Sequence, residues 1–231
     1  MDLRLFIAPG SCSRVSTIAL EEVGVAFETE TVALKLGQHK SPSYLALNPV
    51  GKVPLLLIDG KPLAQTVAIL TWLARSFPAA ALLPDSDAYV EAVALSRLTW
   101  CSSDLHQLVT RMRIPAMSCD LPGSAERTRA QAAAAMATQL APIEASLAVA
   151  PWLQGTAWSV LDAYIFWVWY RIVGAGFPTD RFPFLGDQAR RMALRPAVAR
   201  ALARETAAQI ELDTAGGGVV YPPVLRIVLP E

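Results

Sequence analysis

The chain has 231 residues, and its 20 lysine and arginine residues balance 20 aspartate and glutamate residues. No basic excess points to nucleic acid, and no basic amphipathic segment points to a membrane surface, so we expect neither kind of partner. Hydrophobic residues make up 53% of the chain, which is enough to form a sizeable core in one or two domains.

The N-terminus and the cysteines indicate a cytoplasmic protein. The first ten residues, MDLRLFIAPG, lack the apolar run and cleavage site of a signal peptide. The most apolar stretch, AYIFWVWY, ends at Arg171 and is too short to span a bilayer. The cysteines, Cys12, Cys101 and Cys119, are odd in number and lack the spacing of a disulfide framework or of metal ligands. We therefore expect reduced thiols and no metal site.

The first third of the chain alternates between strand and helix patterns. The run LRLFI at 3–7 predicts a buried strand, and residues 13–23 predict a helix that stops at Gly24. The segment AFETETVAL predicts a second strand. The segment VPLLLIDGKPLAQ predicts two strands around the Asp-Gly turn at 59–60, and TVAILTWLARSF predicts a helix after them. This order mixes parallel and antiparallel strands in a domain of residues 1–78.

The remaining chain carries helical patterns after a linker, PAAALLPDSD, placed at 79–86. No convincing strand follows, and several prolines punctuate the helices. Along the first long helix, apolar residues recur at spacings of four and three and form one stripe, which places Cys101 in the core. We expect an all-helical domain at 87–231, with a C-terminal tail from about residue 206 that is Gly-rich and then apolar over 214–231.

Cys12 stands in the stretch PGSCS, at the first turn of the helix predicted over 13–23. Unpaired backbone N–H groups and the helix dipole favour a thiolate there. Such a position can lower a thiol pKa from about 8.5 into the range of roughly 3.5–7.5. Taken alone, the motif fits a small buried core residue slightly better than a reactive thiol.

Two further short segments have the pattern of ligand-binding loops. In NPVGKVPLLL, a cis Val53–Pro54 bond would turn the Val53 backbone outward, where a peptide-like ligand can pair with it. A strand that simply begins with proline is the commoner alternative. In AQTVAI, Gln65 and Thr66 open a helix, so Thr66 can bind an anion, serve as the N-cap, or do both.

These three segments together resemble the thioredoxin-like domain of cytosolic glutathione transferases. In the second half, WSVLDAYIF resembles the structural capping box of that family, with Ser159 as cap and Asp162 as its partner. PGSCS and DLHQ at 104–107 resemble the bacterial beta, or cysteine-type, class most. The resemblance spans about residues 3–205. It implies the glutathione transferase fold, a thioredoxin-like α/β domain with a mixed four-stranded sheet followed by an all-α domain.

The resemblance also implies a glutathione site in a homodimer. It makes Cys12 and His106 the catalytic residues, although a solvated helix histidine is the alternative for His106. The residues that it implies for glutathione binding are Lys35, Lys52, Val53, Pro54, Gln65, Thr66 and Asp104. Gln65 is neutral where the beta class has an acid. Helical period puts Asp104 and His106 on different flanks, so we expect Asp104 to supply the missing charge to the partner subunit's site. Candidate residues for a second-substrate pocket are Arg111, Met112, Pro115 and Trp167.

The predicted function is that of a cytoplasmic bacterial glutathione transferase acting in detoxification. Glutathione would be the co-substrate, and a small hydrophobic electrophile or a disulfide the second substrate. Conjugation of the EC 2.5.1.18 type and thiol transfer through a mixed disulfide are both compatible with a cysteine. Two alternatives remain: a glutathione-dependent lyase, ether-cleaving or biosynthetic enzyme, and a non-catalytic binding protein of the same fold.

Overall fold

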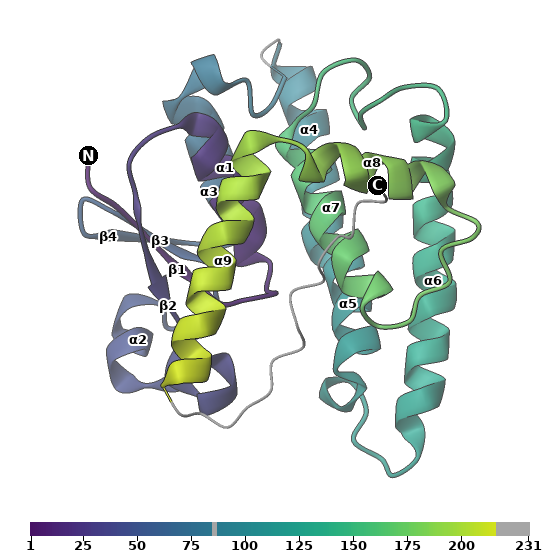
Figure 1. The fold of residues 1–231 in the computed structure, drawn as a ribbon, viewed down its shortest axis with the longest axis horizontal. Helices are drawn as coiled ribbons and strands as arrows, with labels where there is room; N and C mark the ends of the chain where they lie inside the picture. Colours follow the sequence, from purple (N-terminus) through teal and green to yellow (C-terminus); the bar gives the residue numbers. More distant parts are fainter. Residues whose placement is uncertain (85–86, 216–231) are drawn as a thin grey trace. The chain divides into compact units, whose positions relative to one another are not determined.

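The computed structural model describes residues 1–84 and 87–215, and Figure 1 shows its ribbon. The chain divides into two compact units. Of the described residues, 1–82 and 194–215 form the first unit, and the rest form the second. In the described part of the chain, no helix is long and apolar enough to cross a membrane.

The first unit contains the predicted mixed sheet, with strand order β2-β1-β3-β4. β1 (Leu3–Ile7) pairs in parallel with β2 (Glu28–Thr31) and antiparallel with β3 (Leu55–Ile58). β3 in turn pairs antiparallel with β4 (Lys61–Ala64). Four of the five β1 residues are buried, as expected for a central strand covered on both faces. The fold class predicted from the sequence is confirmed.

Helices and short helical turns complete the first unit. They are α1 (Ser13–Val23), η1 (Leu34–Leu36), η2 (Gln38–Lys40), α2 (Pro42–Leu47), α3 (Thr66–Ser76), η3 (Pro78–Ala80) and α9 (Pro196–Thr214). α1 ends at Gly24 as predicted, because the φ of 76° at this residue suits glycine in a left-handed cap. Residues 206–214, expected to begin the tail, are instead helical, and 216–231 lie outside the described residues.

The second unit is built from helices within the described residues. They are α4 (Ala88–Trp100), the π-helical turn η4 (Cys101–Leu105), α5 (His106–Arg113), η5 (Pro115–Met117), α6 (Ser124–Leu147), α7 (Val160–Val173) and α8 (Pro183–Ala193). α4, η4 and α5 follow one another without a break. The predicted apolar stripe along them is confirmed, and Cys101 on it is fully buried. α7 is buried on nearly all sides, as a helix at the centre of a helical core must be.

The predicted capping box opens α7. The Ser159 hydroxyl accepts from the Leu161 N–H at 3.3 Å, and the Asp162 carboxylate accepts from the Ser159 N–H at 3.0 Å. The same carboxylate accepts from the Leu153 N–H at 3.0 Å. Burial raises the pKa of Asp162, although these hydrogen bonds oppose it. The motif thus fixes the start of α7 and the chain before it, which is a structural role.

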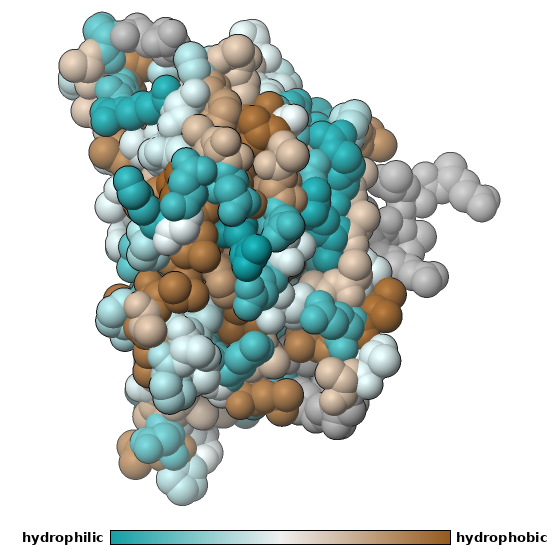
Figure 2. Space-filling model, turned by 90° about the vertical axis from the view of Figure 1, so that its left-hand side faces the viewer, coloured by the Kyte–Doolittle hydropathy of each residue, from teal (hydrophilic) through white to brown (hydrophobic). Residues whose placement is uncertain are grey.

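The surface mixes polar and apolar residues. On the face shown in Figure 2, hydrophilic and hydrophobic residues are interspersed. Exposed apolar residues such as Leu36 and Val50 occur on folded proteins without a binding role, because polar residues alone cannot cover a globular surface.

Candidate functional site

The Cys12 thiol lies against the backbone of another predicted segment. Cys12 immediately precedes α1 and is 7% exposed. Its Sγ atom donates to the Val53 carbonyl oxygen at 3.6 Å. The structure therefore brings together two of the three segments that the sequence singled out, although 41 positions separate them.

The loop before α1 is held by hydroxyl groups. The Ser13 hydroxyl accepts from the Ala8 N–H at 3.2 Å and lies 3.3 Å from the Ala8 carbonyl oxygen, to which it can donate. The Ser11 and Ser13 hydroxyls lie 2.8 Å apart. The serines that flank Cys12 thus order the turn that positions its thiol.

Side chains from α2 and the residue after it hold the backbone of the loop before β3. The Val53–Pro54 peptide bond is cis, the less common of the two alternatives that the sequence left open. The carbonyl of the preceding residue, Lys52, accepts from the Tyr44 hydroxyl at 2.8 Å and from the Asn48 side-chain amide at 2.7 Å. The Lys52 residue itself is exposed. Two buried donors therefore hold the backbone of this loop.

Close packing behind this loop requires glycine at position 51. Gly51 has a φ of 61°, and a Cβ atom there would lie 2.8 Å from the His39 carbonyl oxygen. Any larger residue would displace the segment that carries Lys52 and Val53.

The polar pair opens α3 as predicted, but the N-cap position is that of Gln65, which makes no side-chain capping bond, and not that of Thr66. Thr66 is its first residue and is buried, whereas the Gln65 side chain is exposed. Gln65 adopts a φ of 76°, which is unfavourable for a residue with a side chain. Such conformations are concentrated at ligand sites, where the surrounding structure maintains them. No local sequence signal predicts this conformation, because glutamine has no preference for it.

His106 packs against α7 inside the second unit. Its Nδ1 atom lies 3.5 Å from the Tyr164 hydroxyl, and its ring meets the Trp167 ring edge-on at 4.6 Å between centroids. Tyr164 and Trp167 are buried in the core. His106 is therefore half-buried and has an ordered neighbour, unlike a solvated helix histidine.

A family model matches the N-terminal part of the chain, and a relative from the same family matches most of its length. Residues 1–75 match the model of the glutathione S-transferase N-terminal domain. Glutathione S-transferase GstA of Escherichia coli O157:H7 is 31% identical over 205 residues, which cover 88% of this chain and 98% of GstA. The chain belongs to the glutathione S-transferase family.

Solved structures agree with this assignment. A sphingomonad glutathione S-transferase complexed with glutathione has a TM-score of 0.77 at 33% identity, over 88% of this chain and 98% of that one. The bacterial beta class glutathione S-transferase of Sphingomonas chungbukensis has a TM-score of 0.76 at 33% identity, over 87% and 98%. The fold of a glutathione S-transferase thus extends over most of this chain.

A buried ion pair, which the sequence did not suggest, holds the Cys12 loop of this transferase. Glu205 of α9 accepts from Arg14 of α1 through two hydrogen bonds, at 2.6 and 2.9 Å. The side chains of Arg14 and Glu205 are 1% and 7% exposed. Glu205 also accepts from the Gly10 N–H, two residues before Cys12. The turn with the thiol is therefore tied to α9, which runs beside α1 in Figure 1.

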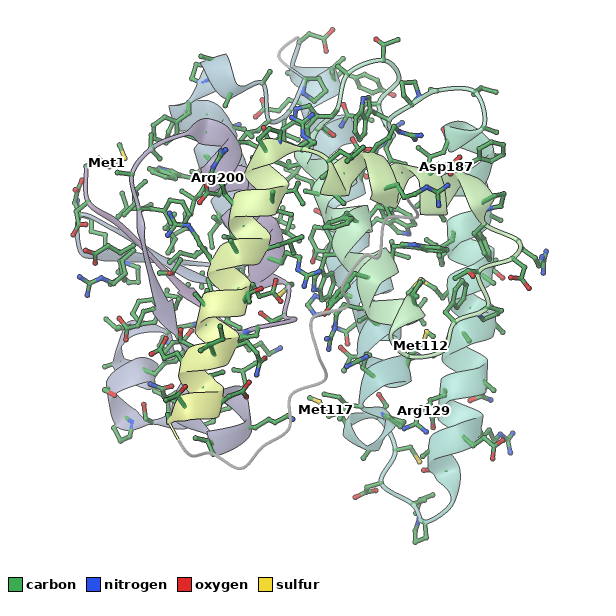
Figure 3. All side chains as sticks on the ribbon, in the orientation of Figure 1. Met1, Met112, Met117, Arg129, Asp187 and Arg200 are labelled. Carbon is green, nitrogen blue, oxygen red and sulfur yellow. The ribbon has the colours of Figure 1, made fainter. Side chains whose placement is uncertain are left out.

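Further ion pairs join α1 to α9 along their length. Glu21 accepts from Arg200 and from Arg204, each at 2.6 Å, and Glu22 accepts from Arg195 at 2.7 Å. Burial pushes the pKa of Glu21 upward, but the two arginines outweigh it and lower the pKa below its usual value. Figure 3 labels Arg200 at this contact.

The remaining predicted site residues are spread over both units. Lys35 is exposed on η1, and Asp104 is exposed on η4, where the Ser103 hydroxyl donates to it at 3.3 Å. Of the four second-substrate candidates, only Arg111 has an exposed side chain. The other three are buried: Met112, Pro115 and Trp167. Within the described chain, no group of three or more histidine, cysteine or acidic side chains is arranged to hold a metal ion.

Proposed function

We propose that this glutathione S-transferase family member is a transferase of the cysteine type, in which Cys12 acts on the sulfur of glutathione. The observation that carries the proposal is the position of Cys12 at the start of α1, with its sulfur 3.6 Å from the Val53 carbonyl oxygen. A thiol in this position lies beside the backbone segment with which a peptide ligand would pair.

The glutathione site would use the backbone at Val53 and the start of α3. The Val53 backbone would pair with the cysteinyl part of glutathione. The Thr66 hydroxyl and N–H would receive the γ-glutamyl carboxylate, since a helix N-terminus favours an anion. Lys35 and Lys52 are exposed cations that would attract the glycine carboxylate. Gln65 would contact the ammonium group, with the partner subunit's Asp104 supplying the negative charge.

In thiol transfer, Cys12 would be the nucleophile. Its thiolate attacks the glutathione sulfur of a mixed disulfide, a Cys12–glutathione bond forms, and the other thiol leaves. A second glutathione thiolate then attacks that bond, which regenerates Cys12 and releases glutathione disulfide. His106, fixed by Tyr164 and Trp167, would exchange protons with the leaving sulfur.

Conjugation would use the same groups differently. Cys12, which donates a hydrogen bond to a carbonyl in this structure, would instead donate one to the glutathione thiolate. That thiolate would attack a small hydrophobic electrophile. The two reactions differ in whether glutathione becomes covalently bound to Cys12.

Retention on a glutathione matrix and mass spectrometry of the Cys12 peptide test the proposal. We expect retention of the wild-type protein and of Cys12→Ala, and a glutathione adduct on the wild-type peptide alone. Cys12→Ala should lose disulfide-exchange activity with 2-hydroxyethyl disulfide and glutathione. Unchanged exchange activity in Cys12→Ala, or a wild-type protein that the matrix does not retain, would contradict the proposal.

A further inference from the structure

A cavity of about 260 Å³ lies in the second unit, between α5, α6 and the loop that joins them. Figure 3 labels Met112, Met117 and Arg129 around the joined ends of these helices. None of the residues that line the cavity is among those proposed above to bind glutathione.

Short side chains on α6 leave room for the cavity. Ala132 and Ala135 are three residues apart, so they share one helix face, and both line the groove together with Leu108 of α5. The volume is just below the range of roughly 300–1,000 Å³ that is typical of sites for drug-sized ligands. The cavity is therefore too small to enclose a drug-sized molecule, but it can hold part of a small ligand.

The polar part of the lining combines a cation with a thiol. The Arg111 side chain is exposed, and it makes no hydrogen bond or ion pair with any other residue that the structure describes. Cys119, on the loop, is partly exposed and is not in a disulfide. Gln131 adds an amide to the same wall. A guanidinium without an acidic partner favours a carboxylate ligand, which it can hold through two hydrogen bonds.

The Cys119 thiol has neighbours that favour its ionised form. Hydrogen bonds with the Ser124 side chain and the Leu121 backbone lower the pKa of Cys119, and they outweigh burial and the Asp120 carboxylate, which raise it. The Ser124 hydroxyl also donates to the Cys119 backbone carbonyl at 3.1 Å. Cys101 differs, because burial raises the pKa of its thiol. The thiolate is the form that attacks disulfides, so Cys119 has a reactivity that Cys101 lacks.

We propose that this cavity is a second thiol site, at which Cys119 forms a mixed disulfide with glutathione while Arg111 holds a glutathione carboxylate. The Cys119 thiolate attacks one sulfur of glutathione disulfide. A bond forms between Cys119 and that sulfur, the disulfide bond breaks, and the second glutathione leaves as a thiolate that takes a proton from water. Cys119 is oxidised and the departing glutathione is reduced, so glutathione disulfide is the only oxidant. The choice of ligand rests on the proposed function, but the exchange does not require Cys12.

Peptide mapping after exposure to glutathione disulfide tests the proposal on the full chain. Trypsin leaves each cysteine on its own peptide, at 5–14, 98–111 and 114–127. We expect glutathione on the peptide 114–127 in the wild-type protein and equally in Cys12→Ala, and none on that peptide in Cys119→Ser. Loss of the adduct at 5–14 alone would count against the proposed function and leave this site intact.

The role of Arg111 is tested by comparing two disulfides. Arg111→Gln should slow the modification of Cys119 by glutathione disulfide several-fold, and should leave its reaction with the uncharged 2-hydroxyethyl disulfide unchanged. Arg97→Gln removes an exposed charge from α4, outside the cavity, and should slow neither reaction.

Two results would overturn this second site. One is the absence of glutathione from Cys119 in Cys12→Ala under conditions in which 2-hydroxyethyl disulfide modifies it. The other is an Arg111→Gln variant in which Cys119 reacts with both disulfides at equally reduced rates, or with both at the wild-type rate. Either outcome would mean that Arg111 does not recognise the carboxylate.

Discussion

Cys12, Cys101 and Cys119 differ in exposure and in the groups around their sulfur atoms. Cys101 is completely buried, and burial raises the pKa of its thiol. Cys12 lies at the N-terminal end of α1, where unpaired backbone N–H groups favour an anion, and hydrogen bonds lower the pKa of Cys119. At neutral pH we expect iodoacetamide to modify Cys101 more than about tenfold more slowly than either of the others, since only the thiolate reacts. Timed peptide mapping measures the three rates, and a Cys101 rate equal to that of Cys12 would show that the helix around it opens readily.

Thr66 and Thr71 allow a matched comparison on α3. Thr66 is the proposed carboxylate contact, whereas the Thr71 hydroxyl donates to the Val67 carbonyl at 2.8 Å within the helix. Thr66→Ala should weaken glutathione binding by about 1.5–3 kcal/mol, the usual contribution of a hydrogen bond to a charged group. Thr71→Ala should leave binding unchanged. Calorimetric titration measures the glutathione affinity of each variant. Equal affinities for the two variants would show that Thr66 does not bind the carboxylate.

At the scale of elements, the contact between α1 and α9 depends on Glu205. Glu205→Gln would remove the negative charge from the buried pair with Arg14 and would weaken the hydrogen bond that Glu205 accepts from the Gly10 N–H. The free energy of unfolding should fall by about 3–5 kcal/mol, as when one partner of a buried ion pair is lost. Cys12 should also become more accessible to alkylation, because its loop loses an anchor.

Glu211, on the same helix, provides the control. Its carboxylate accepts from the Thr31 hydroxyl at 2.6 Å in an exposed position. Glu211→Gln should change the free energy of unfolding by less than about 0.5 kcal/mol. Similar losses in the two variants, measured by urea unfolding, would show that burial of the Arg14 pair is not what holds α9 in place.

The Glu21 cluster makes this contact sensitive to pH. The pKa of Glu21 is lower in the folded protein than its usual value, so its stabilising effect is complete above the unfolded pKa and is lost as the pH falls through the folded pKa. At neutral pH, Glu21→Gln should be less stable than wild type by about 1 kcal/mol, a small value because Arg200 is more than half exposed. The difference should shrink below about pH 4.5. A difference that grows on acidification would contradict this sign.

For the whole molecule, local signals predicted the elements and missed the contacts between distant ones. The Asp-Gly turn, the glycine after α1 and the capping box at Ser159 act within a few residues, and each was predicted correctly. The hydrogen bonds that Glu205 accepts from Arg14 and Gly10 join positions more than 190 residues apart. The local sequence around each residue does not indicate its distant partner.

The same limit applies to the site. The motif around Cys12 and the Val53–Pro54 segment were recognised separately, and the structure adds that they touch. The positive φ at Gln65 and the π-helical turn before His106 have no local sequence signature, so they emerge only from the fold. The sequence also could not separate pocket residues from core residues, because both recur at the same apolar spacing on a helix. Met112, a candidate for the second-substrate pocket, is buried in the core.

The neutral Gln65 side chain cannot neutralise the ammonium group of glutathione, so the proposed site needs a negative charge from another subunit. Asp104 is exposed in this chain, as a residue that serves a neighbouring subunit must be before assembly. If the partner subunit's Asp104 makes the charged hydrogen bond, Asp104→Asn should reduce glutathione affinity by about 1.5–3 kcal/mol. Cys12 should still react with small alkylating agents at nearly the wild-type rate, whereas His106→Asn should slow thiol chemistry with little loss of binding. Wild-type affinity in Asp104→Asn, or a wild-type protein that sediments as a monomer at micromolar concentration, would exclude a site shared between subunits.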